Sequence, residues 1–498
     1  MMADTGRAPA GRAAYWSVPL IPALLTLAIS VTGISGASFW LDEAATVGMT
    51  RRSVGEMVRV FDTLDLVHAC YYLLLKPWAA VFGTGEVALR MPSALAMAGA
   101  AAGVAALGRR CADPVTGLLS GSVFAGCSTV TRFAQEARSP ALVTLVAVLA
   151  TYLLVRGVDG RRRRWFAGYG LAVVLLGTLH LYAALLIPAH GVTLFWLSRR
   201  RDPNGRNGSD AALWRSWAAA ASVAVVAVGA LAWAARAQQD QVSWITAPNG
   251  RTLLALVRFL SGGPPLPPIV MALAVAGLVA AAVRRGVLTP VVLPWLVLPP
   301  ATLLLFSLAR PVFLQRYVTF CLPAMALAVG AGLAWLARRN RPAVVGVLAL
   351  VTVLTVPLQR DLREQDSRPD DLRAAADVLR LHARPGDGIV FLDPILRWDA
   401  AAYPDAYRPL ADLTLETDPV TAGDLKGVDA SPSVLRSRLS GVNRVWVMND
   451  RSLRNASDPS TARDRWTAVT ASGLRRSGVW RYRGGSLTLM VRRAAPGR

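Results

Sequence analysis

Two adjacent carboxylates, Asp42 and Glu43, follow the first long apolar segment of the chain within a few residues. An ionised group so close to a membrane surface is costly unless it is paired or used in chemistry. Adjacent positions on a helix do not share a face, so at most one of the two side chains is expected to point into a cleft. The alternative is a solvated helix N-terminus, where acidic residues interact favourably with the helix dipole. Spacing alone does not separate the two.

A second polar pair, Asp65 and His68, stands three residues apart and directly precedes Tyr71 and Tyr72. On a helix this spacing puts both polar side chains on one face. Such a face could bind a sugar. It could equally be the polar rim of an interfacial helix whose tyrosines belong to the aromatic belt at the membrane surface.

A third polar group lies in two segments that the charge pattern places outside the membrane. Arg132, Gln135 and Arg138 stand together in the first, and Arg316 with Tyr317 in the second. Arginine on the outer side runs against the positive-inside bias of membrane proteins, so it needs a reason. The planar guanidinium fork matches a phosphate group well. An ion pair with one of the acidic residues above is the alternative.

The elements that must position these residues are mainly membrane helices, because 54% of the chain is hydrophobic. The apolar residues gather in nearly charge-free blocks of about 17 to 23 residues, the length that a helix needs to cross about 30 Å of hydrocarbon. Between the first two blocks, residues 38–87 are expected to form surface-lying or re-entrant helices. We predict about eleven spans. They are 15–37, 88–107, 115–130, 141–155, 166–181, 183–197, 217–235, 266–283, 287–308, 318–336 and 343–356.

The arginines explain the formal net charge of +23, because they cluster in runs between the apolar blocks. Such runs indicate membrane topology, and they lack the interleaved aromatic residues of a nucleic-acid site, so nucleic acid is excluded as a partner. A single threading puts every run on the cytoplasmic side. It predicts a multi-pass protein of the cell membrane, with the N-terminus in the cytoplasm and the C-terminal region outside. The four scattered cysteines match neither a zinc site nor a disulfide framework.

Composition changes abruptly after Pro357, where the chain becomes charged and alternating. We therefore predict a cytoplasmic tail over 1–14, a transmembrane domain over 15–358 and a soluble extracytoplasmic domain over 359–498. In the last, DDLRAAADVLRLHA has helical spacing, and GIVFL, NRVWVM and LTLMV are typical of strands. The predicted fold is mainly α, a polytopic transmembrane helical bundle with a small C-terminal α/β domain.

Several segments carry a family resemblance when they are taken in order: FWLDEA, DLVHACYYLLLKPWAAVFGTGEVALRMPSALA, RFAQEARSPAL and PVFLQRYVTFCLPA. With the span pattern they cover about residues 15–360. The chain resembles the GT-C superfamily of membrane glycosyltransferases, specifically the bacterial relatives of dolichyl-phosphate-mannose protein mannosyltransferases. It departs from them at Ala69 and Cys70, where relatives commonly have paired prolines, and at Pro140.

The resemblance implies that a polyprenyl-phosphate sugar binds from the membrane lipid and that a mannose-like hexose or a pentose is transferred, with inversion, in an outer cleft. It implies that Asp42 is the general base on the acceptor hydroxyl, that Glu43 supports it, and that Arg316 and Arg138 suit the departing phosphate. The acceptor is a glycan, a lipid or a protein. No cofactor is required, although outer carboxylates make a divalent metal possible.

Two further function classes are compatible with a polytopic chain. A transporter or lipid-linked glycan flippase would place ionisable groups at mid-span and often shows internal repeats, whereas the polar clusters here lie at outer ends. A non-catalytic relative could bind lipid-linked glycan, and Asp42 would then be dispensable. The C-terminal domain is expected to select the acceptor or to shield the cleft.

Overall fold

The computed structural model describes residues 10–160, 163–201, 209–450 and 459–492. Most of the predicted cytoplasmic tail over 1–14 lies outside the described residues, as do residues 161 and 162 between two predicted spans. The chain divides into two compact units. A helical unit comprises Met1–Thr32 and Arg90–Asp361, and a second unit comprises Gly33–Leu89 and Leu362–Arg498. The second unit is therefore assembled from two distant stretches of sequence.

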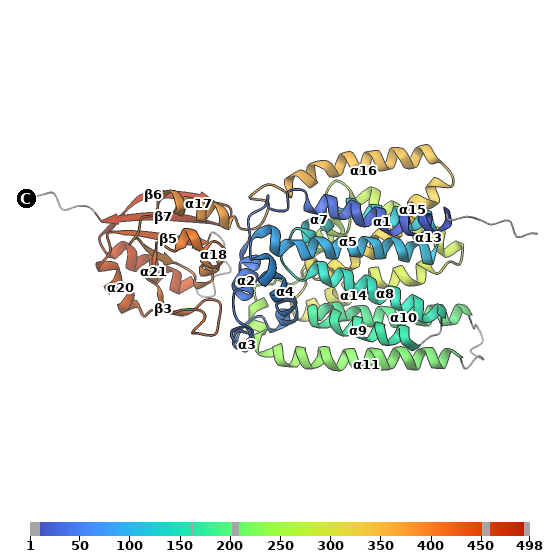
Figure 1. The fold of residues 1–498 in the computed structure, drawn as a ribbon, viewed down its shortest axis with the longest axis horizontal. Coiled ribbons are helices and arrows are strands. Elements are labelled where there is room, and N and C mark those ends of the chain that lie inside the picture. The colour runs from blue at the N-terminus through green and yellow to red at the C-terminus, as the bar shows by residue number, and fades with distance from the viewer. Residues whose placement is uncertain (1–9, 161–162, 202–208, 451–458, 493–498) are drawn as a thin grey trace, which may run out of the picture. The chain divides into compact units, whose positions relative to one another are not determined.

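Long helices make up the helical unit, where Figure 1 shows them side by side. Within the described residues, seven helices are long and apolar enough to cross a membrane, and four are apolar but shorter. This agrees with the predicted multi-pass bundle. The helices are α1 (Ala10–Val31), α5 (Glu86–Cys111), α6 (Pro114–Gly126), α7 (Ser128–Ala134), α8 (Pro140–Gly160), α9 (Arg163–Leu179), α10 (Leu186–Arg201), α11 (Ser209–Ala235), α12 (Gly250–Leu260), α13 (Pro267–Val283), α14 (Leu288–Ala309), α15 (Leu322–Ala337) and α16 (Arg341–Asp361), with the 3-10 turns η2 (Leu181–Leu185), η3 (Arg236–Val242) and η4 (Gln315–Cys321).

Small residues let these helices approach each other closely, as is usual where lipid removes the hydrophobic driving force between helices. A Cβ atom added at Gly277 of α13 would overlap the carbonyl oxygen of Ala328 in α15. In return, a Cβ at Gly332 of α15 would overlap the carbonyl oxygen of Leu273. The two backbones are thus in contact, and glycine is needed on both sides of the crossing.

The first stretch of the second unit contains short helices, as expected for residues 38–87. They are α2 (Leu41–Thr50), α3 (Val54–Phe61), the 3-10 turn η1 (Leu66–His68) and α4 (Ala69–Phe82). Helix α3 begins with a capping box in which the Ser53 side chain accepts from the Glu56 N–H and Glu56 accepts from the Ser53 N–H. At 10, 8 and 14 residues, α2, α3 and α4 are each shorter than a membrane crossing.

The second stretch forms the predicted α/β fold. The strands are β1 (Gly388–Phe391), β2 (Ala411–Asp412), β3 (Leu415–Thr417), β4 (Val428–Asp429), β5 (Arg444–Asp450), β6 (Leu474–Tyr482) and β7 (Gly485–Arg492). The helices are α17 (Leu372–His382), η5 (Pro394–Leu396), α18 (Arg397–Ala402), α19 (Pro404–Tyr407), α20 (Pro432–Ser440) and α21 (Pro459–Ala471). Five strands form one sheet in the order β2-β1-β5-β7-β6, and β3 pairs with β4. The predicted helix and all three predicted strands are confirmed.

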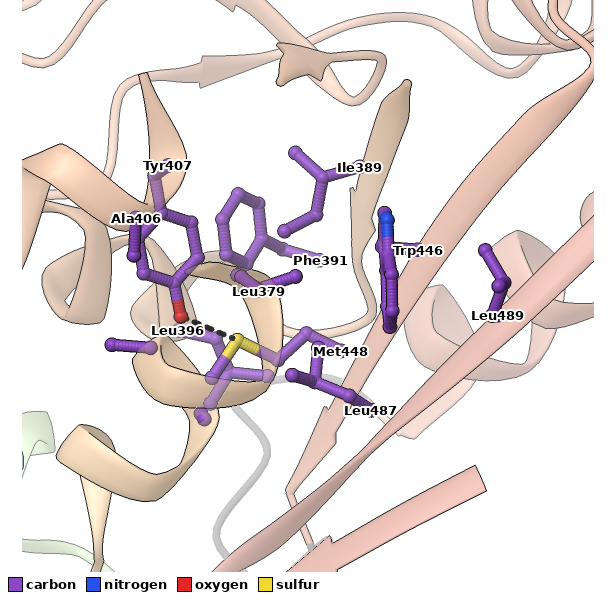
Figure 2. Packing of buried hydrophobic residues seen from close by; sticks show 12 residues of the cluster. Leu379, Ile389, Phe391, Leu396, Ala406, Tyr407, Trp446, Met448, Leu487 and Leu489 are labelled. Carbon is purple, nitrogen blue, oxygen red and sulfur yellow. Dashed lines mark hydrogen bonds between the residues drawn. The ribbon is translucent and has the colours of Figure 1, made fainter. Parts of the chain in front are cut away.

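The sheet is buried on both faces, which explains why GIVFL is a continuous apolar run. Strand β1 is parallel to β2 and β5, whereas β7 is antiparallel to both of its neighbours. Figure 2 shows the cluster on one face, where Phe391 and Tyr407 lie near Trp446 and Met448. A second cluster, which includes Val390 and Leu439, covers the other face.

Candidate active site

Asp42 and Glu43 occupy the first turn of α2. Glu43 is fully buried, with 0% of its surface exposed, and Asp42 is partly exposed. The alternative of a solvated helix N-terminus is therefore wrong for Glu43. Helix α2 packs against α4 and against α18 of the same unit. Only Asp42 of the pair has the exposure that a group in contact with a substrate needs.

Asp65 and His68 do not share a face of a regular helix, which corrects the expectation from their spacing. Asp65 has a left-handed backbone with φ of 57°, and His68 belongs to the 3-10 turn that follows. The Tyr72 hydroxyl donates to Asp65 Oδ2 at 2.7 Å, and the His68 and Tyr72 rings meet edge to face at 6.2 Å. Tyr71 and Tyr72 are 1% and 0% exposed, so they are not an exposed aromatic belt. The 3-10 turn and the contacts of Tyr72 thus bring Asp65 and His68 together.

Arg132 and Gln135 lie in the helical unit, on α7 and directly after it. The Arg132 guanidinium forms an ion pair with Glu136, so its acidic partner comes from the same segment. Gln135 is buried, and its Nε2 donates to the carbonyl oxygens of Ser30 and Thr32, each at 2.9 Å. These carbonyls stand at the C-terminal end of α1, where a helix leaves acceptors unsatisfied. Gln135 thus has a structural task that its sequence position did not reveal. Arg138, two residues before α8, is partly exposed.

Arg316 and Tyr317 lie in the 3-10 turn η4 and belong to an aromatic cluster. The Tyr317 ring lies 5.1 Å from the His180 ring and 5.4 Å from the Tyr182 ring, measured between centroids. The guanidinium carbon of Arg316 lies 5.8 Å from the Tyr317 centroid, within cation–π range. Turn η2, which carries Tyr182, contacts η4. The cluster combines one positive charge with flat apolar faces, a combination suited to a phosphate next to a sugar or an isoprenoid.

Sequence reasoning missed Tyr182, which separates the predicted spans 166–181 and 183–197. The signal was the absence of a polar turn between two apolar blocks, at a point where His180 and Tyr182 flank a single leucine. His190, by contrast, has an interhelical role. It is buried, with Nε2 at 3.0 Å from Thr151 Oγ1 and Nδ1 at 3.2 Å from the Tyr169 hydroxyl.

The structure thus divides the predicted site residues between its two units. Asp42, Glu43, Asp65 and His68 belong to the unit that contains the C-terminal domain, and the remaining predicted residues belong to the helical unit. Within the described ranges, no group of three or more His, Cys, Asp or Glu side chains is arranged to hold a metal ion.

Comparison with known proteins supplies the family context for this arrangement. Residues 70–233 match the family model described as dolichyl-phosphate-mannose-protein mannosyltransferase. A search of curated proteins found no significant match.

Solved structures with the same fold extend over almost the whole chain. ArnT from Cupriavidus metallidurans in the apo state aligns with a TM-score of 0.62 at 14% identity, covering 96% of this chain and 98% of ArnT. The same protein bound to undecaprenyl phosphate aligns with a TM-score of 0.59 at 15% identity, over 97% and 98% of the two chains. The apo oligosaccharyltransferase of Archaeoglobus fulgidus gives 0.55 at 12% identity, over 88% and 70%.

The chain has the fold of ArnT, and residues 70–233 match a glycosyltransferase family model, so the class to which fold and match together point is a multi-pass membrane glycosyltransferase. Within that class, the matching family model is that of the dolichyl-phosphate-mannose-protein mannosyltransferases, which is the resemblance that the sequence indicated.

Proposed function

We propose that this glycosyltransferase moves a hexose or pentose from a polyprenyl-phosphate donor to a hydroxyl group of an extracytoplasmic acceptor, with inversion at the anomeric carbon. Two structures with the same fold support the donor class. ArnT from C. metallidurans has been solved with undecaprenyl phosphate, and the A. fulgidus oligosaccharyltransferase with an inhibitory peptide and a dolichol-phosphate at a TM-score of 0.55.

The observation that carries the proposal is the acidic pair at the start of α2. Transfer from an anomeric phosphate needs a proton acceptor next to the attacking hydroxyl. Asp42 takes that role because it is the more exposed of the two carboxylates. The acceptor oxygen loses its proton to Asp42 and bonds to the anomeric carbon as the bond from that carbon to the phosphate oxygen breaks. Glu43, which is buried beside it, is proposed to support Asp42 in this role.

The leaving phosphate needs positive charge, and preorganised charge of this kind contributes much of the stabilisation in such reactions. We assign this role first to Arg316, which stands above an aromatic cluster, and second to Arg138. Arg132, which forms an ion pair with Glu136, is also proposed to bind substrate. Asp65 and His68 are proposed to bind sugar hydroxyls in the donor or the acceptor.

No step of this scheme requires a metal, because the guanidinium groups can meet the phosphate charge. We propose that transfer proceeds in the presence of EDTA. A loss of activity in EDTA that Mg²⁺ or Mn²⁺ restores would instead assign a divalent cation to the carboxylates of the second unit.

The test of the function is sugar transfer from radiolabelled polyprenyl-phosphate donors into extracted membrane products. Asp42→Asn is compared with wild type at matched expression, with Asp405→Asn as the control because its side chain is 75% exposed. Loss of a general base typically costs about 10²- to 10⁴-fold in rate. We expect that loss in Asp42→Asn and wild-type activity in the control.

Equal labelling in all three proteins would exclude Asp42 as the base. Absence of labelling with every donor, in a folded wild-type preparation, would favour a flippase or a binding protein instead.

A further inference from the structure

One arginine of α17, Arg373, binds the segment that leads into α2 at several points. Arg373 Nη2 donates to the carbonyl oxygens of Ser35 at 2.8 Å and Ala37 at 3.2 Å, and its Nη1 donates to that of Gly36 at 3.2 Å. Its backbone N–H donates to the Ser38 hydroxyl at 2.9 Å. One residue therefore binds four consecutive positions, and the last of them lies four residues before Asp42.

The same guanidinium also contacts Glu86, near the C-terminal end of residues 33–89. Arg373 forms an ion pair with Glu86, in which Nη2 meets Oε2 and Nε donates to Oε1 at 3.3 Å. The two side chains are 23% and 14% exposed, so solvent screens this bidentate pair little. Desolvation opposes the charge of Arg373, but the bonds and the charge of Glu86 raise its pKa overall.

Tyr403, which lies between α18 and α19, closes the arrangement. Its hydroxyl donates to Glu86 Oε1 at 2.5 Å and accepts from the Phe39 N–H at 3.1 Å. The same hydroxyl lies 3.4 Å from Ser38 Oγ. Ser38 and Phe39 are 0% and 1% exposed, so these bonds are made in a dry environment where they are strong.

Two more contacts fix the residues next to Asp42. The Leu41 N–H, the first of α2, donates to Asp370 Oδ2 at 3.3 Å, and the Ser38 N–H donates to the Gln365 carbonyl at 2.9 Å. A Cβ atom at Gly36 would overlap the carbonyl of Arg363, so the two backbones touch there. The backbone from Ser35 to Leu41 is thus fixed by 363–403, a part of the C-terminal domain.

We propose that Arg373, Glu86 and Tyr403 are positioning residues: they form a clamp through which the C-terminal domain holds Asp42 in place for proton transfer. This inference rests on the proposed function. The clamp residues touch the backbone ahead of α2, and their effect on the reaction passes through Asp42. A displacement of about 1 Å at a catalytic group can cost about 100-fold in rate, so a clamp of this kind has kinetic weight.

The first test compares Arg373→Gln and Tyr403→Phe with wild type in the full-length protein. The control is Arg444→Gln, which breaks a similar partly buried bond, at 2.9 Å to Asp387, elsewhere in the C-terminal domain. We expect kcat of Arg373→Gln to fall about 10- to 100-fold, with the donor KM within about twofold, because the donor site itself is unchanged. Arg373→Lys, which keeps the charge, should recover part of the rate. Tyr403→Phe should show a smaller fall and the control almost none.

The second test uses Asp42→Asn as background. If Arg373 acts through Asp42, adding Arg373→Gln to Asp42→Asn leaves the residual rate unchanged, because groups that act as a unit are not additive. A merely structural role would lower the residual rate by the same factor as in wild type. Additive losses, or an unchanged kcat in Arg373→Gln, would overturn the positioning role.

A third measurement separates failure of the clamp from failure of the proposed function. Hydrogen exchange of the solubilised full-length protein should become faster over residues 38–50 in Arg373→Gln and stay unchanged in Arg444→Gln. Unchanged exchange in both variants would exclude the clamp even if the protein transferred sugar. If the wild-type protein transferred no sugar but exchange were faster in Arg373→Gln alone, the clamp would be supported and the transferase scheme rejected.

Discussion

At the scale of single residues, burial separates the polar side chains that the sequence singles out. Gln135 and His190 have bonds within the bundle that account for their burial. Asp42 and Arg316 are partly exposed and therefore remain the candidates for contact with a substrate. The sequence singled out Gln135, Asp42 and Arg316 alike. Separating them needed the three-dimensional structure, because the partners of Gln135 are backbone carbonyls about 100 residues away.

The buried carboxyl group of Asp399, in the C-terminal domain, leads to a prediction at this scale. Asp399 is 0% exposed, and burial raises its pKa well above the ordinary value, helped by the nearby charges of Asp370 and Asp371. The folded domain therefore keeps a proton that the unfolded chain releases near pH 4. Stability must fall as the pH rises from about 4 towards the folded-state pKa, because the folded state then binds more protons than the unfolded state.

Asp399→Asn, which has nearly the same shape and no titration, should remove this fall. We expect the Tm of the variant to exceed that of wild type by at least about 2 °C at pH 7 and the difference to shrink towards pH 4. Thermal unfolding at a series of pH values measures it, with exposed Asp405→Asn as the control. A variant that is destabilised equally at every pH would contradict the assignment of a neutral Asp399.

At the scale of elements, helices and strands with a strong local pattern were predictable, and irregular ones were not. The helix over 372–382 has an apolar stripe and an Asp371 cap, and both are visible in sequence. The predicted span over 115–130 instead breaks at Cys127 between α6 and α7, and no proline or charge marks the break. The turn at Asp65 was missed because its left-handed backbone is usual for glycine and only occasional for aspartate.

The contact of α13 with α15 provides a test of packing at this scale. Gly332→Leu would drive a side chain into the Leu273 carbonyl, whereas a Cβ atom added at Gly346 in α16 meets nothing within 4 Å, so Gly346→Leu is the control. Overpacking costs about 1–3 kcal/mol or more. We expect a lower Tm and a lower yield of folded protein in detergent for Gly332→Leu only. Equal behaviour of the two variants would show that the helices do not approach so closely.

At the scale of the whole molecule, the sequence predicted a mainly helical membrane protein with a small α/β domain, and the fold agrees. It did not predict that residues 33–89 belong with residues 362–498. No local pattern reports such an association, since it depends on Arg373, Tyr403 and Glu86, which are distant in the chain and ordinary in type. Composition indicates whether a segment lies in lipid or in water, but it does not indicate which other segment of the chain it packs against.

The predicted orientation is testable at the same scale. Single cysteines at Arg408 and Arg285, in a variant lacking the four native cysteines, should react differently with a membrane-impermeant maleimide on intact cells. The Arg408 side chain is 80% exposed in the C-terminal domain and should be labelled from outside. Arg285, between α13 and α14, should be labelled only after the membrane is broken. The reverse pattern would invert the topology.

The discontinuous second unit also has a consequence for biosynthesis. Residues 33–89 leave the ribosome before the helical unit is complete, and residues 362–498 follow it. At about 5–20 residues per second, the stretch between them takes on the order of 15–50 s to synthesise. Until then, Ser35 to Leu41 have no Arg373 or Tyr403 to bind. The order of translation therefore delays the contacts that fix the start of α2 until the membrane helices have been made.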